Sequence, residues 1–124
     1  MRTGMSDSRF FRVGDRGDVL VLRLLPVSLD RNAANEFWAD LLAVIESNSA
    51  AHIVINLADT TQISSPALAK LIALDKRISA RGGKLLICEA LPAVNQIISL
   101  AWPGRCSEEA ITEEAAISSL AGTV

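Results

Sequence analysis

The side chains that could perform chemistry in this chain are few, and they do not cluster along the sequence. Cys88 and Cys106 are far apart and His52 is the single histidine, whereas protein metal sites need cysteine and histidine ligands at short, characteristic spacings. One histidine also gives little support to a Ser/His/Asp or Cys/His nucleophilic site. No glycine-rich phosphate-binding loop occurs. The sequence therefore predicts no catalytic residue, no metal site and no cofactor.

Two serines precede a proline in the segment QISSPALAK. A hydroxyl at the N-cap followed by proline at the first helical position is a strong signature of a helix start. The pattern predicts that Ser65 caps a helix whose first residue is Pro66. Capping alone explains Ser64 and Ser65, and the alternative is that one of them accepts a phosphate.

Asp75 is an unusual residue in that helix, because helical spacing places it among inward-facing apolar positions. An unpaired buried carboxylate is costly, so we expect a hydrogen-bond or ion-pair partner, either an arginine or backbone N–H groups of a nearby loop.

The opposite face of the helix is basic and is expected either to be solvated or to dock a partner protein. That face comprises Lys70, Lys76, Arg77 and Arg81.

Apolar runs and turn residues predict the elements that position these side chains. Two strands around the turn at residues 14–18 form a hairpin, and residues 52–57 and 84–89 form central strands. Helices are expected from Ser28 or Asp30 to about Ser47, from residue 65 to Gly82, from Pro92 to before Pro103, and after Thr112. Residues 106–111 are assigned a short edge strand. Strands that alternate with helices indicate a mostly parallel sheet, which the hairpin makes mixed.

The pattern also predicts which side chains are buried. Val94, Ile97 and Ile98 are expected to face inward from the third helix. Trp38 is assigned to the core, whereas Trp102 is left open between the core and an exposed interface anchor.

Composition limits the class of protein. The chain has 124 residues, half of them hydrophobic, which suits one domain with its own core; residues 1–8 are assigned to a flexible tail and 9–124 to the domain. The net charge of −2 gives no electrostatic case for direct nucleic-acid binding. The longest apolar run, residues 19–25, is interrupted by Arg23 and is too short to span a bilayer. We therefore predict a cytoplasmic protein without membrane insertion.

The order of elements and the segment INLADTTQISSPALAKLIALDKRISARGGKLLICEALPAV resemble the STAS domain of bacterial anti-sigma-factor antagonists. Pro92 and the acidic EEA stretch near the C-terminus also resemble the family, and the similarity covers roughly residues 10–121. It implies an α/β fold with a mixed sheet of four or five strands. About four helices are expected, with the main ones packed on one face.

The resemblance also implies a site. Family members carry a motif close to Asp-Ser-Ser-Gly-Leu, whose second serine takes phosphate from a partner kinase that is also the anti-sigma factor. Aligned on Leu68, the phosphorylated serine falls on Pro66, which has no hydroxyl. The expected partner-binding residues are Thr60, Thr61, Gln62, Ser64, Ser65, Pro66, Ala67 and Lys70, with Ser65 and Ser64 as candidate displaced phosphosites.

Three functions follow from this resemblance. The first is a non-enzymatic module that binds an anti-sigma factor or a kinase-like regulator in a partner-switching system. The alternative is a STAS subunit that docks on the ATPase or permease of a membrane transporter. An enzyme or small-ligand binder has the least support. A weak homodimer of this chain is also compatible with the predicted fold.

Overall fold

A four-stranded mixed sheet forms the centre of the protein. The computed structural model describes residues 8–26, 30–48, 50–102 and 111–121. The strands are β1 (Phe11–Arg16), β2 (Val19–Leu24), β3 (His52–Asn56) and β4 (Leu85–Cys88). They lie in the order β1-β2-β3-β4, with β1 antiparallel to β2 and the other two pairs parallel. The predicted mixed sheet is confirmed.

Four helices complete the described fold: α1 (Arg31–Glu46), α2 (Ser65–Ala80), α3 (Pro92–Ala101) and α4 (Glu113–Ala121). Asp30 caps α1 by accepting a hydrogen bond from Ala33 N–H, as one of the two predicted caps; the other, Ser28, lies outside the described residues. Thr112 caps α4, and its hydroxyl accepts from Ala115 N–H at 3.1 Å. Gly82 ends α2 with a φ of 82°, a conformation that favours glycine.

The start of α2 differs from the prediction by one residue. Ser64, not Ser65, is the N-cap: its backbone is extended (φ −81°, ψ 157°) and its hydroxyl accepts from Ala67 N–H. Ser65 is already helical although it precedes Pro66, a position where proline disfavours the helical conformation. The bond between Leu68 N–H and the Ser64 carbonyl, 2.9 Å long, fixes this register. Two adjacent hydroxyls made the cap ambiguous in the sequence.

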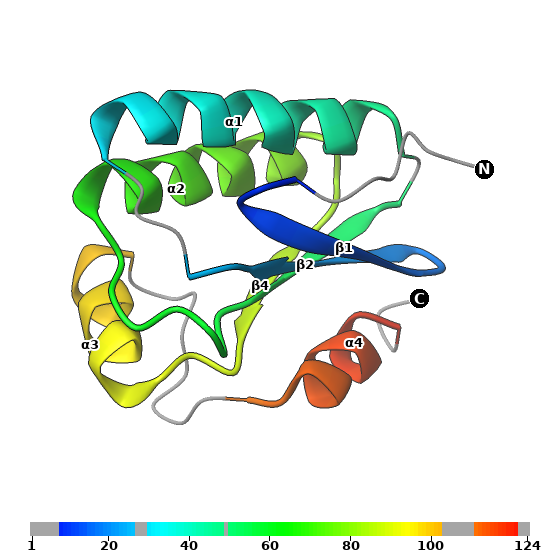
Figure 1. Ribbon diagram of the computed structural model, residues 1–124. Coiled ribbons are helices and arrows are strands. Elements are labelled where there is room, and N and C mark those ends of the chain that lie inside the picture. The colour runs from blue at the N-terminus through cyan, green and yellow to red at the C-terminus, as the bar shows by residue number, and fades with distance from the viewer. Residues whose placement is uncertain (1–7, 27–29, 49, 103–110, 122–124) are drawn as a thin grey trace.

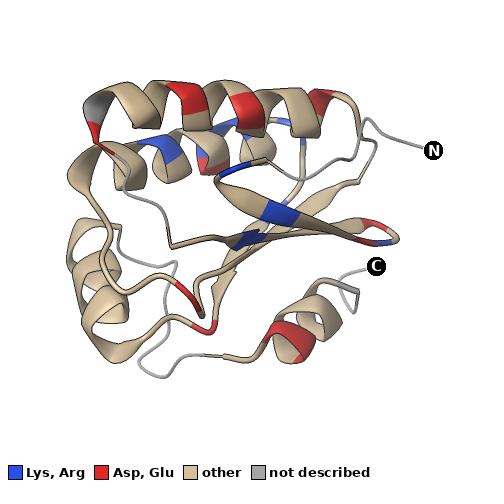
Figure 2. Ribbon diagram, viewed as in Figure 1, with Lys and Arg blue, Asp and Glu red and all other residues tan. Residues whose placement is uncertain are grey.

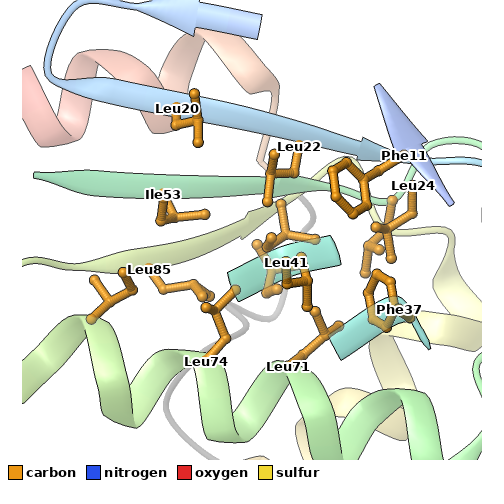
Figure 3. Close-up of a cluster of buried hydrophobic side chains, with 14 of the residues drawn as sticks. Phe11, Leu20, Leu22, Leu24, Phe37, Leu41, Ile53, Leu71, Leu74 and Leu85 are labelled. Atoms are coloured by element: carbon orange, nitrogen blue, oxygen red, sulfur yellow. The ribbon is translucent and has the colours of Figure 1, made fainter. Parts of the chain in front are cut away.

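The two faces of the sheet are covered unequally. In Figure 1, α1 and α2 lie together over one face, whereas α4 lies on the opposite side. The α1/α2 face holds the larger apolar cluster, in which strand residues such as Leu22 and Ile53 meet Leu41 and Leu71 of the helices (Figure 3). The α4 face holds a smaller cluster of buried residues, comprising Val19, Val21, Val54, Cys88, Ala116, Ile117 and Leu120.

Several side-chain predictions have clear outcomes. Val94 and Ile98 are fully buried, but Ile97 is 45% exposed, so the prediction that it faces inward is wrong. The apolar arc of α3 also includes Leu100, but only Val94 and Ile98 on it are buried, so the buried part of this face is narrower than the apolar pattern indicated. Trp102 is buried, and Trp38 is half-buried against the larger cluster.

The predicted boundaries at the two ends are partly testable. Ser8, assigned to the tail, donates a hydrogen bond from its hydroxyl to Asp40 at 2.7 Å, so the folded region includes it. Of the predicted edge strand, residues 106–110 lie outside the described residues. Ile111 is in no strand, although its carbonyl accepts a 2.7 Å hydrogen bond from Glu89 N–H.

Candidate partner-binding site

Five of the eight predicted site residues line a hollow where β2 and β3 end and α1 and α2 begin, whereas Ser65, Pro66 and Lys70 do not line it. The hollow has a volume of about 350 Å³, at the small end of the range for ligand pockets. It is lined by Leu24, Leu25, Pro26, Asp30, Thr60, Thr61, Gln62, Ile63, Ser64 and Ala67. Residues from the β2–α1 connection therefore face the β3–α2 loop, residues 57–64, across the hollow.

The predicted residues differ in how much surface they offer. Thr61, Gln62 and Ser65 are exposed, and Ser64, Pro66 and Lys70 are half-buried. Thr60 and Ala67 are only 7% and 1% exposed, so a partner could meet them only from within the hollow. The Thr60 hydroxyl is buried without a hydrogen-bond partner.

The other half of the hollow was missed by the sequence reasoning. Leu24, Leu25, Pro26 and Asp30 were read as the end of a strand and the cap of a helix. A signal did exist, because parallel neighbours such as β2 and β3 place the segments that follow them at the same edge of the sheet. The segment after the first buried strand could therefore have been assigned to the same edge as the motif.

The N-terminus of α2 offers little to an anion, although helix N-termini generally attract negative charge. Its Ala67 N–H is taken by the Ser64 hydroxyl at 3.2 Å, and Pro66 has no N–H. Ser65, by contrast, is exposed on the first turn. The arrangement presents a hydroxyl at Ser65 and buries much of the one at Ser64.

The β3–α2 loop is attached to the sheet by polar contacts at its first residues. Arg23 of β2 binds Asp59 through two hydrogen bonds of 3.0 and 3.3 Å. This contact lowers the pKa of Asp59 and raises that of Arg23. Asn56 accepts from Ala58 N–H at 2.8 Å. These contacts hold the loop close to the end of β3.

Charge is unevenly distributed around this edge of the sheet. Figure 2 shows acidic residues where β3 and β4 end, and the sequence places Asp59 and Glu89 there, whereas α3 carries no charged residue. Neither acid contributes to a metal cluster: within the described ranges, no three Asp, Glu, His or Cys residues are grouped so as to hold an ion.

The basic face of α2 is largely engaged with neighbouring elements. Lys70 Nζ lies 6.0 Å from the ring centre of Trp38 on α1, and Arg77 lies 3.7 Å from Glu46. Arg81 donates to the Ala50 carbonyl at 3.3 Å. Lys76, Arg77 and Arg81 nevertheless remain exposed, as expected for a face that is solvated or docks a partner.

Asp75 and His52 have structural partners. Asp75 is 8% exposed; its carboxylate accepts from the Trp102 indole at 3.3 Å and from the Ser79 hydroxyl at 3.5 Å. Asp75 therefore has hydrogen-bond partners, as its burial requires, and these two are side chains. His52 Nδ1 accepts from Lys84 N–H at 3.1 Å, which links β3 to the start of β4.

Comparison with known proteins agrees with this geometry. The STAS domain family model matches residues 12–101. The unphosphorylated form of the anti-sigma factor antagonist SpoIIAA superposes with a TM-score of 0.76 at 21% identity, covering 92% of this chain and 98% of that chain. Its phosphorylated form, from Bacillus, gives 0.68 at 19% identity over 88% and 97% of the two chains. A putative anti-sigma factor antagonist from Thermotoga maritima gives 0.74 at 21% identity over 91% and 96%.

The family match extends from β1 to the end of α3 and includes every residue that lines the hollow. None of the helices in the described part of the chain is long and apolar enough to cross a membrane. On the extent of the family match and the agreement of the fold, this chain belongs to the STAS domain family.

Proposed function

We propose that this protein is a non-enzymatic regulatory module of the cytoplasm that binds an anti-sigma factor or a kinase-like regulator. Its partner surface comprises the β3–α2 loop, the first turn of α2 and the rim of the hollow. The partner covers the exposed residues Thr61, Gln62 and Ser65 and inserts a side chain between the loop and the β2–α1 connection.

One observation supports the proposal: five of the eight residues expected from the motif line one hollow on the surface. Thr60, Thr61, Gln62, Ser64 and Ala67 all line it. Apolar lining from Leu24 and Ile63 sits beside exposed polar groups, and a partly apolar centre with a polar rim is the usual anatomy of a protein interface.

The regulation of this surface differs from that of phosphorylated relatives such as SpoIIAA, which occurs in a phosphorylated form. Pro66 stands at the corresponding position and has no acceptor hydroxyl. The exposed Ser65 is the better alternative, because Ser64 already accepts the Ala67 N–H as a cap. Since capping explains Ser64 and the helix start without any modification, we favour a binding surface that stays available and is controlled by the state of the partner.

The proposal is tested by capture from native lysate followed by binding to the purified captured protein. Recovery of an ATP-binding regulator supports it, whereas recovery of an ABC-type ATPase or a permease supports docking on a transporter. The double variant Thr61→Glu with Gln62→Glu adds two charges to the rim and should weaken binding to the purified partner at least about tenfold, or 1.4 kcal/mol.

A matched control adds the same charge elsewhere. Ser118 and Ser119 are exposed on α4, on the other side of the sheet, so Ser118→Glu with Ser119→Glu should leave binding unchanged. Undiminished binding by the folded rim variant, or equal loss in the control, would contradict the proposed surface.

A separate experiment addresses phosphorylation. Incubation with the captured kinase and ATP, followed by mapping of phosphate by mass spectrometry, should give either no phosphate or phosphate on Ser65. In the second case Ser65→Ala should abolish it, and the modified protein should bind its partner less tightly through added charge and bulk. Stoichiometric phosphate confined to residues outside 60–65 would refute a displaced switch.

A further inference from the structure

Asn56 is a polar residue at the end of the apolar central strand, and it is only 2% exposed. Its side-chain oxygen accepts from Ala58 N–H and its side-chain nitrogen donates to Glu113 Oε1, both at 2.8 Å. The two partners determine the orientation of the amide, because an N–H group needs the oxygen and a carboxylate needs the nitrogen. Both ends of this buried amide are therefore satisfied.

The two hydrogen bonds of Asn56 reach different parts of the molecule. Ala58 is in the β3–α2 loop, next to Asp59, which is bound by Arg23. Glu113 is the first residue of α4, which lies on the α4 face of the sheet (Figure 1). Asn56 is thus a direct link between the loop that carries the candidate site and a helix that does not contribute to the hollow.

The α4 end of this link is itself fixed to β4. The backbone N–H of Glu113 donates to Glu89 Oε2 at 2.9 Å, and Glu89 N–H donates to the Ile111 carbonyl at 2.7 Å. Glu89 has a φ of 56°, a left-handed conformation that is rare for a residue with a side chain and persists only where surrounding contacts enforce it. The side chain of Glu113 is therefore held in a defined position relative to the ends of β3 and β4.

We propose that Asn56 is a positioning residue for the β3–α2 loop, and that through its bond to Glu113 the docking of α4 sets the conformation of that loop. The importance of this coupling for function depends on the partner-binding role proposed above. An event that lifts α4 from the sheet would change the candidate site without touching it.

The first test removes the α4 end of the link. In Glu113→Ala the backbone bond to Glu89 survives, because it comes from the N–H, but the acceptor for the Asn56 nitrogen is lost. The Ala58 N–H donates to the Asn56 side chain and the Thr60 N–H to the Leu57 carbonyl. Amide hydrogen exchange measured by NMR should become about tenfold faster at these two residues. Exchange at the amides of β3 should change only as much as the free energy of global unfolding changes.

A matched control lies one residue further along. Glu114→Ala removes an exposed carboxylate from the same turn, one that binds Arg16 and not Asn56. It should leave exchange at Ala58 and Thr60 unchanged. An unchanged loop in Glu113→Ala, or an equal response in Glu114→Ala, would overturn the assignment to Asn56.

The second test reverses the polarity of the bond. Asn56→Asp places a carboxylate against that of Glu113 and should loosen the loop. Adding Glu113→Gln supplies an amide that donates to the new carboxylate, whose second oxygen still accepts the Ala58 N–H, so the double variant should restore slow exchange. Glu113→Gln alone keeps an acceptor oxygen and should have little effect. Failure of the double variant to recover would contradict direct coupling.

These measurements contain no partner protein, so they separate two failures. An unresponsive loop would overturn the coupling and leave the proposed partner surface standing. A responsive loop in a protein whose rim variants still bind normally would leave the coupling standing and overturn the surface.

Discussion

The two faces of the sheet are stabilised in different ways. On the α1/α2 face, long side chains from every strand and from three helices form a continuous cluster, with Phe37 in edge contacts to Phe10 and Phe11 at 5.7 and 6.2 Å between ring centres. On the α4 face, three side chains of one short helix contact the strands. Polar contacts from Glu113 and Glu114 supply the rest of that attachment.

The two faces therefore differ in how much they contribute to stability and in how far their attachment depends on single contacts. Burial is non-directional and adds up over many side chains, so the α1/α2 face supplies most of the stability, and a truncation there is costly. Hydrogen bonds and ion pairs depend on individual partners, so the α4 face can be altered by one substitution or one binding event. It is also the face that connects to the candidate site through Asn56.

The largest expected effect compares matched leucines on the two faces. Leu41→Ala on α1 removes a fully buried side chain from the larger cluster and should cost about 4–5 kcal/mol, the upper part of the range for such cavities. Leu120→Ala on α4 should cost about 2–3 kcal/mol, because a short helix can shift to fill the space. Urea denaturation measures the free energy of unfolding of both variants. Equal losses would contradict the conclusion that the α1/α2 face contributes more to stability than the α4 face.

A polar pair inside the α1/α2 face gives the next effect. Trp102→Phe removes the indole donor to Asp75 and should cost about 1–3 kcal/mol, since a buried carboxylate loses a hydrogen bond. Asp75→Asn retains an oxygen for the indole and should cost less. Thermal denaturation of both variants shows which of them loses more stability. If Asp75→Asn were the more damaging, the charge of Asp75 rather than its hydrogen bond to Trp102 would be what matters.

The sequence predicted the fold in most of its parts because the fold is encoded by local patterns. The HIVIN strand is buried on both faces, as its continuous apolar run indicated, and the caps at Asp30 and Thr112 have the expected side chains. Ile97 was misplaced because the apolar arc of α3 is wider than the part that is buried, so periodicity identifies the arc but not which of its residues meet the core. Ser64 and Ser65 could not be distinguished because either hydroxyl suits an N-cap.

The candidate site was predicted only in its linear half. The motif drew attention to residues 60–67. Leu24, Leu25 and Pro26 join the hollow because β2 pairs in parallel with β3, so assigning them requires the predicted parallel sheet to be combined with the position of the motif. The hydrogen bond between Asp75 and the Trp102 indole was likewise not predicted, because Trp102 follows α3 and meets α2 only in the folded chain. Asn56 looked like the end of a strand, and its two hydrogen bonds depend on where α4 docks.

The reactivity of Cys88 reports how tightly α4 packs on the sheet. It is 1% exposed within the α4 cluster, and its desolvation, with smaller effects of Glu113 and Glu89, raises the pKa of the thiol from 9.0 to about 12. In the folded protein, labelling of Cys88 by iodoacetamide at pH 8 should be slow, and Leu120→Ala should accelerate it by loosening α4. Peptide mapping identifies the site.

The same residue gives a pH dependence with a defined sign. A folded-state pKa above the unfolded value means that the thiol stabilises the fold below about pH 9, and that this contribution is lost as the pH rises from about 9 towards 12. Stability should therefore fall more steeply over this range in the wild-type protein than in Cys88→Ala. Identical slopes would show that Cys88 is more accessible than its burial indicates.

The smallest effect is expected at the ion pair between Arg16 and Glu114, whose atoms lie 3.0 Å apart at the protein surface. Exposed pairs contribute little and are screened by salt, so Glu114→Gln should shift the melting temperature only slightly at low salt and not at all at 1 M. The hydrogen bond to Arg16 lowers the pKa of Glu114, so any contribution is present above the unfolded pKa and is lost as the pH falls through the folded one. If Glu114→Gln lost as much stability as Leu120→Ala, surface charge rather than the three apolar side chains would be what holds α4 on the sheet.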